Sequence, residues 1–154
     1  MNDSTQVKEF WRNFCALSGT PPETPYQVWH FGNTAEMATE LVELVLAGKK
    51  QATASLVQFN ELHPDVAPIE DGYSVVTDFE GAPRGVIRTT EIRQIPFMKV
   101  DAAFAFDEGE GDQSLEYWRD VHHRFFTREA AENGLEFHEK SLICCERFEL
   151  LFPE

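Results

Sequence analysis

Lys50, Thr53 and Ser55 follow one another at short intervals, so an amine and two hydroxyls are available to a single point. A threonine hydroxyl is a weak nucleophile at neutral pH and needs a neighbouring base. A lysine can be that base when burial or nearby positive charge lowers its pKa, and Lys49 and Arg88 are candidate neighbours. The residues alone are compatible with hydroxyl-based catalysis, and equally with a surface lysine beside an ordinary strand threonine.

A glycine-flanked acid is the second candidate for chemistry. Glu110 lies between Gly109 and Gly111, ahead of a predicted helix, and the glycines give its backbone the freedom to aim one carboxylate. A carboxyl whose pKa is raised by burial can protonate the leaving nitrogen of an amide. The plain alternative is a solvated loop whose acids favour the helix dipole, which suits Asp112 best. Glu108, Glu110 and Asp112 are an alternative divalent-metal set, although their spacing matches no calcium-loop pattern.

Three further side chains are candidates for holding a substrate. Trp29 lies in a short apolar stretch and either lines a pocket or belongs to the core. Arg88 lies in a β-branched apolar run, so its guanidinium either faces solvent or meets an anion or carboxylate in a cavity. The Ser55 hydroxyl is a candidate donor to an acyl oxygen, with backbone N–H groups near Gly48 as the alternative.

The elements that must position these residues follow from hydrophobic spacing and from turn residues. Helices are expected at 3–17 with Asp3 as cap, 33–47 with Asn33 as cap, 100–106 and 114–126, and a separate helical piece is expected at 127–133. Strands are expected at 28–32, 52–59, 73–79, 85–95 and 141–152. The strand at 52–59 would carry Thr53, Ser55 and Val57 on one side.

Helices segregated from hairpin-linked strands indicate an α+β domain, built as a small mixed β-barrel with helices packed outside. Residues 1–27 are expected to form an N-terminal capping helix and a proline-rich connector. Residues 28–154 are expected to form the main domain.

Composition and charge limit the partners. A chain of 154 residues with 42% hydrophobic residues is long enough for one domain with a real core. No apolar run approaches the ~20 residues of a membrane span, and the start lacks a signal peptide, so we expect a soluble cytoplasmic protein. The net charge of −14 argues against a broad nucleic-acid surface. If the partner is a nucleic acid, a nucleoside or a short single-stranded RNA is therefore expected, and no cofactor is expected.

The pattern Gly48-x-Lys50-x-x-Thr53-x-Ser55 resembles the signature of the ASCH domain (activating signal cointegrator homology), a β-barrel related to PUA domains. Segments 29–32, 86–91 and 108–118 resemble, in the same order, the bacterial single-domain branch of that family. The resemblance covers about residues 28–152. Many members carry Glu and Arg where this chain has Thr53 and Ser55.

The resemblance implies RNA-related work. Some members resemble amidohydrolases that remove the acyl group of N4-acetylcytidine with a Lys, a Thr and a Glu. By position these are Lys50 as base, Thr53 as nucleophile and Glu110 as proton donor. Other members act as ribonucleases on single-stranded RNA, and PUA relatives bind RNA. A single-stranded RNA binder, or a ribonuclease aided by a metal on Glu108, Glu110 and Asp112, is therefore the second expectation.

Overall fold

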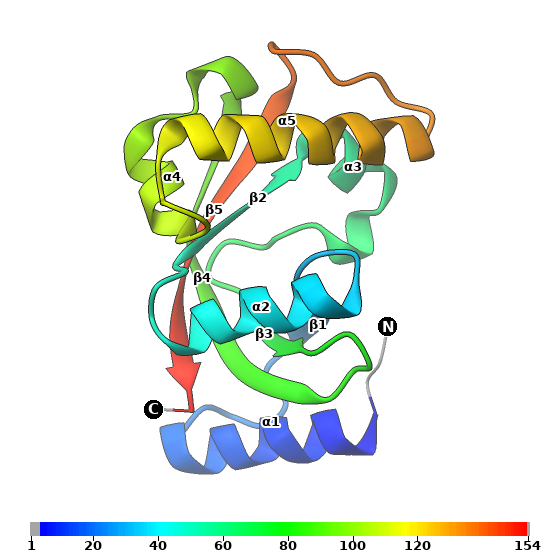
Figure 1. Cartoon of the computed structure of the whole chain (residues 1–154). Coiled ribbons are helices and arrows are strands. Elements are labelled where there is room, and N and C mark those ends of the chain that lie inside the picture. Colours follow the sequence, from blue (N-terminus) through cyan, green and yellow to red (C-terminus); the bar gives the residue numbers. More distant parts are fainter. Residues whose placement is uncertain (1–3, 154) are drawn as a thin grey trace.

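A mixed five-stranded sheet forms the centre of the protein in a computed structural model, which describes residues 4–153. Its strands in spatial order are β1 (Tyr26–His30), β3 (Tyr73–Thr77), β4 (Pro83–Pro96), β5 (Leu142–Phe152) and β2 (Ala52–Leu56). β1 runs parallel to β3, and the other neighbours are antiparallel. The sheet curls into a half-barrel with helices outside it (Figure 1). The α+β class and the curled mixed sheet with helices packed outside, both expected from the sequence, are confirmed.

Helix α1 (Thr5–Ser18) covers one end of the half-barrel (Figure 1). The Ser4 side chain caps it by accepting the N–H of Val7; the expected cap, Asp3, lies outside the described residues. Its buried face packs on β3 and β4 in a cluster made of Val7, Trp11, Phe14, Cys15, Val75 and Val86. The expected capping helix is therefore present, and it is part of the core.

Helix α2 (Ala35–Leu46) lies against the sheet between α1 and the upper helices of Figure 1. Thr34, not Asn33, caps it, because the Thr34 hydroxyl accepts the N–H of Met37 at 3.1 Å. Its fully buried residues are Ala38, Val42 and Val45. Val42 and Val45 pack in a cluster with Phe31, Val76, Ile87 and Phe148.

The strand expected at 52–59 is shorter than predicted. β2 ends at Leu56, and helix α3 (Val57–Leu62) follows without a break. Val57 therefore does not share a strand face with Thr53, and the prediction for it is wrong. The chain leaves the sheet where the pairing of β2 with β5 stops, since β-branched residues near a strand end do not by themselves keep the chain extended. A 3-10 turn (Pro64–Val66) follows α3.

Helices α4 (Ala102–Glu108) and α5 (Leu115–Glu132) cover the other end of the sheet, after a 3-10 turn at Phe97–Lys99 (Figure 1). The two helical pieces predicted at 114–126 and 127–133 form one helix, because Phe126 and Ala130 both pack into the same core cluster. None of the helices in the described part of the chain is long and apolar enough to cross a bilayer.

Candidate functional site

A cavity of about 740 Å³ opens between α2 and α5, above β2. This volume is within the range of small-molecule sites. Its lining residues come from three strands, β1, β2 and β5, and from several helices and loops, and they include Trp29, Thr53, Ser55, Glu108, Glu110, Tyr117, His122 and Glu146. Five of the residues predicted from the sequence, Trp29, Thr53, Ser55, Glu108 and Glu110, therefore meet in one hollow.

Lys50 lies directly behind the cavity wall and is 1% exposed. Its ammonium donates to Glu108 Oε1 at 2.7 Å and to Glu110 Oε2 at 2.6 Å, and to the backbone carbonyl of Glu108 at 3.3 Å. Helix α2 ends just before it, and the N–H groups of Gly48, Lys49 and Lys50 are bonded to carbonyls of that helix. These N–H groups are therefore not free to stabilise an acyl oxygen, as the sequence had suggested for the Gly48 region.

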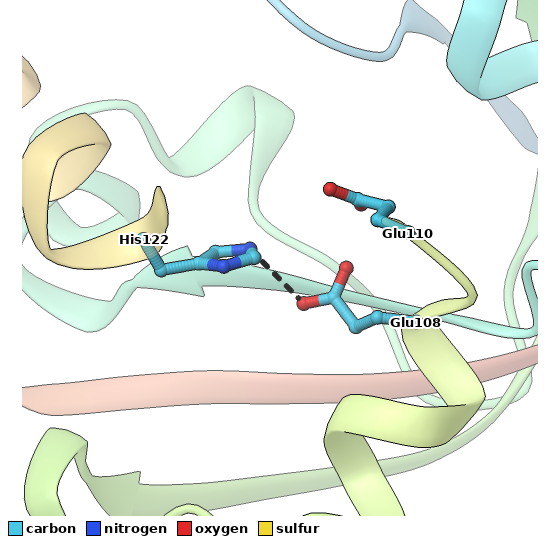
Figure 2. A group of neighbouring side chains, drawn as sticks. All are labelled: Glu108, Glu110 and His122. Atoms are coloured by element: carbon cyan, nitrogen blue, oxygen red, sulfur yellow. Dashed lines mark ion pairs between the residues drawn. The ribbon is translucent and has the colours of Figure 1, made fainter. Parts of the chain in front are cut away.

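Glu108, the last residue of α4, is the central carboxylate of the cluster and is buried. Besides Lys50, it accepts the indole N–H of Trp118 at 2.8 Å and lies 3.3 Å from His122 Nε2. Figure 2 shows the Glu108 and Glu110 carboxylates and the His122 ring side by side, contributed by α4, the following loop and α5. The other ring nitrogen of His122, Nδ1, lies 2.9 Å from the Trp118 carbonyl. Both ring nitrogens thus face acceptors, which matches a protonated imidazolium.

Burial and ion pairing compete at each of these groups. For Glu108, burial acts to raise the pKa, but Lys50 and His122 offset this and hold it well below its usual value. For Lys50, burial acts to lower the pKa, but the two carboxylates raise it above the ordinary value. Burial and the negative charge of Glu108 raise the pKa of Glu110. Two cations therefore face two acids, and Glu110 is the acid that accepts a proton most readily.

The hydroxyl of Thr53 has no hydrogen-bond partner among the described residues, and it lines the cavity. Ser55, two residues along β2, accepts a hydrogen bond from the Asn60 amide at 2.9 Å and lines the same wall. Trp29 is half-buried and packs edge-on against Phe31 at 4.7 Å between ring centroids. The geometry leaves the Thr53 hydroxyl available to a bound molecule.

Besides Lys50, two predicted residues do not line the cavity. Arg88 pairs with Asp71 at 3.1 Å at the surface, 37% exposed, because its register opposite Tyr73 turns it away from the hollow. Asp112 is fully exposed, and its carboxylate accepts the N–H of Ser114 at 2.9 Å at the start of α5. Arg88 is therefore not placed to hold a substrate in this cavity. Asp112 does not join Glu108 and Glu110 in a metal set.

A different set of three possible metal ligands lies together in the structure. Glu108, Glu110 and His122 each offer a ligand atom within 4.8 Å of the others. A metal would require a neutral imidazole and carboxylates free to ligate. Both ring nitrogens of His122 face acceptors, and the Lys50 ammonium contacts both carboxylates. The trio therefore does not fit a divalent metal while Lys50 stays in place.

Sequence reasoning missed Trp118 and His122 as partners of the cluster. Both lie on α5 four residues apart, a spacing that puts them on one helix face, and this was a usable signal. Glu146 on β5 was also missed, because nothing local distinguishes it from other strand acids.

The comparisons with known proteins agree with this architecture. A family model described as the ASCH domain matches residues 27–151. An ASCH-domain structure from Lactobacillus crispatus JV V101 superposes with a TM-score of 0.88 at 28% identity, covering 96% of this chain and 95% of that one. A structure from Enterococcus faecalis V583 gives 0.84 at 34% identity, covering 96% and 90%. No curated protein matches the chain.

The curled mixed sheet with its outer helices is that of a PUA-like domain, a class associated with RNA. Within this class, the chain belongs to the ASCH domain family.

Proposed function

We propose that the protein hydrolyses the amide bond of an N4-acylated cytidine, such as N4-acetylcytidine, with Lys50, Thr53 and Glu110 as the reacting groups. The observation that carries the proposal is the part-buried contact of 2.6 Å between the buried Lys50 ammonium and Glu110, at the wall of the cavity that Thr53 lines. A neutral nucleoside suits a hollow in a body of net charge −14, because it is not repelled as a polyphosphate is.

Lys50 is protonated at rest, so it must lose a proton before it can act as a base. Burial favours the neutral form of both partners, while their attraction favours the charged forms. A substrate that expels water from the cavity shifts this competition towards the neutral pair. The proton then moves from Lys50 to Glu110 along their hydrogen bond, and this leaves a free amine and a carboxylic acid.

The chemical step follows from that transfer. The Thr53 oxygen attacks the acyl carbon and gives its proton to the Lys50 amine. The C–N bond breaks, and Glu110 gives its proton to the leaving N4 atom, so that cytidine departs and the Lys50–Glu110 ion pair is restored. Water then hydrolyses the acyl-threonine by the same proton route and releases the acid. The Ser55 hydroxyl, positioned by Asn60, is the candidate donor to the acyl oxygen.

The test is product analysis of N4-acetylcytidine incubated with the protein, with and without a chelator. We expect acetate and cytidine in both cases. Thr53→Val should lower turnover at least about a thousandfold, whereas Thr53→Ser, which keeps a hydroxyl, should stay within about tenfold of the wild type. Lys50→Met should abolish turnover, and Lys49→Met, at an exposed neighbour, is its matched control. Unchanged turnover in Lys50→Met contradicts the proposal.

RNA handling is the second candidate. Two arginines of α5, Arg124 and Arg128, line the cavity mouth and are the observation that favours it, since guanidinium groups bind phosphate well. Arg124 is already paired with Asp120 at 2.8 Å, which weakens the case. A short single-stranded RNA should bind at low salt and be released steeply as salt rises if this candidate holds. Absence of RNA binding at low salt removes it.

A further inference from the structure

Glu146 is a buried acid in the cavity wall to which the proposed reaction gives no role. It is 4% exposed and lies on β5, directly opposite Thr53 of β2 in the antiparallel register. Directly opposed residues share a sheet face, with Cβ atoms about 4.5–5.5 Å apart. A substrate whose acyl carbon sits at Thr53 therefore lies beside Glu146.

Only one oxygen of this carboxyl has a protein partner in the described part of the chain. Oε2 accepts the Thr89 hydroxyl at 2.6 Å. Oε1 has no hydrogen-bond partner among the described residues. Within them, Arg88 Nε is the only fully buried side-chain polar atom without a partner, so the unpaired Oε1 is not fully buried. Since Glu146 lines the cavity, its free oxygen is directed at whatever the cavity holds.

We propose that Glu146 reads the ring edge of the substrate as a neutral carboxyl, donating from Oε1 to the ring nitrogen N3 and accepting at Oε2 from the adjacent N4–H. This inference rests on the proposed function, because it takes the reacting amide to lie at Thr53. An acylated cytosine presents this acceptor–donor pair next to the bond that breaks. A carboxyl that is both donor and acceptor matches it at two points, as bidentate readers of bases do.

The surroundings of Glu146 keep its carboxyl neutral at pH values below about 7. Burial raises the pKa of Glu146 to about 7, and the hydrogen bond from Thr89 and the charge of Lys50 oppose the rise. Glu108 adds to the rise, Glu110 and His122 face Glu146 across the cavity, and the Cys144 thiol lies two residues away on β5. Once Glu146 ionises, it has no proton to donate to N3, so the ring contact should weaken as pH rises through about 7.

Measuring the affinity for the product, cytidine, tests the ring contact of Glu146 separately from catalysis. Affinities of cytidine and of 3-deazacytidine, which lacks the N3 acceptor, are measured by calorimetry for wild type, Glu146→Gln and Glu146→Met. At about pH 6 the wild type should prefer cytidine about tenfold or more, because the analogue leaves a buried donor unpaired. Glu146→Gln keeps a donor and an acceptor and should keep the preference, whereas Glu146→Met should lose it. Glu149→Gln, at an exposed acid of the same strand, is the matched control.

The pH series decides the case if Glu146→Met does not fold. From about pH 6 to about pH 8 the preference of the wild type should shrink, while that of Glu146→Gln should stay constant. A preference that survives in a folded Glu146→Met, an equal decline in Glu146→Gln, or no cytidine binding by the wild type overturns the ring-reading role. A wild type that shows the expected preference but never releases acetate from N4-acetylcytidine overturns the hydrolase proposal instead.

Discussion

At the scale of residues, the central feature is the Lys50 ammonium, which pairs with one buried carboxylate, Glu108, and one partly buried carboxylate, Glu110. Isolated charges cost several kcal/mol to bury, and removing one partner of a buried pair typically costs about 3–5 kcal/mol. Glu108 compensates with three donors, from Lys50, Trp118 and His122. Glu110 is bonded only to Lys50 among the described side chains and faces the cavity. These contacts favour a structural role for Glu108 and agree with the proposal that Glu110 is the proton donor.

Glu110→Gln should separate these two carboxylates in function. The amide keeps the size of the side chain but cannot carry the proton to the leaving nitrogen, so turnover of N4-acetylcytidine should fall about 10²- to 10⁴-fold. Thermal unfolding should change far less than in Glu108→Gln, which leaves three donors facing an uncharged amide. Steady-state kinetics and melting curves of both variants check this. Equal turnover in Glu110→Gln and the wild type contradicts the proton-donor role.

At the scale of elements, the turn between α4 and the acidic loop holds the cluster together. Gly109 ends α4 in the left-handed conformation, with φ of +71°, and packs on the chain just before β2. A Cβ at this position would strike the Lys49 carbonyl and lie 2.9 Å from Lys50 Cα. The close approach brings the end of α4 against the lysine segment, so Glu108 and Glu110 both reach Lys50.

Gly109→Ala should therefore destabilise the protein more than its backbone angle alone requires. Gly134 after α5 is a matched control, because its φ is +69° and nothing lies within 4 Å of its added Cβ. Gly134→Ala should cost about 1 kcal/mol from backbone strain, and Gly109→Ala should cost a further ~1–3 kcal/mol from overpacking. Denaturant unfolding of both variants measures the difference. Equal losses would show that the close approach contributes nothing.

At the scale of the whole molecule, the negative net charge and the open cavity favour one kind of partner over another. The net charge of −14 acts over roughly the Debye length, about 8 Å at physiological salt, so it opposes polyanions more than neutral ligands. The cavity is large enough for a single nucleoside.

Salt should therefore separate a nucleoside substrate from an RNA substrate. Between about 0.05 M and about 0.5 M salt, kcat/KM for N4-acetylcytidine should change less than about twofold, because the substrate carries no charge to be screened. Binding of single-stranded RNA through phosphate contacts would instead fall steeply over the same range. A steep loss of nucleoside turnover with salt contradicts the assignment of a neutral substrate.

The sequence by itself determined most of the elements and part of the site. Hydrophobic spacing and turn residues located the helices and the hairpin-linked strands, and the Gly48 segment and the glycine-flanked acid pointed to Lys50, Thr53 and Glu110. These signals are local, because the hydrophobic stripe of a helix, the alternation of a strand and a short motif are each contained in a short run of consecutive residues.

Only the tertiary structure decided which side chains meet. Lys50 contacts acids 58 and 60 residues away, and Thr89 contacts Glu146 across 57 residues. Such contacts depend on strand register, where a slip of one residue turns every side chain to the other face, and on which face of α5 packs inward. Arg88 was a candidate for the hollow and lies outside it for this reason, and Glu146 opposite Thr53 is visible only once β2 and β5 are paired.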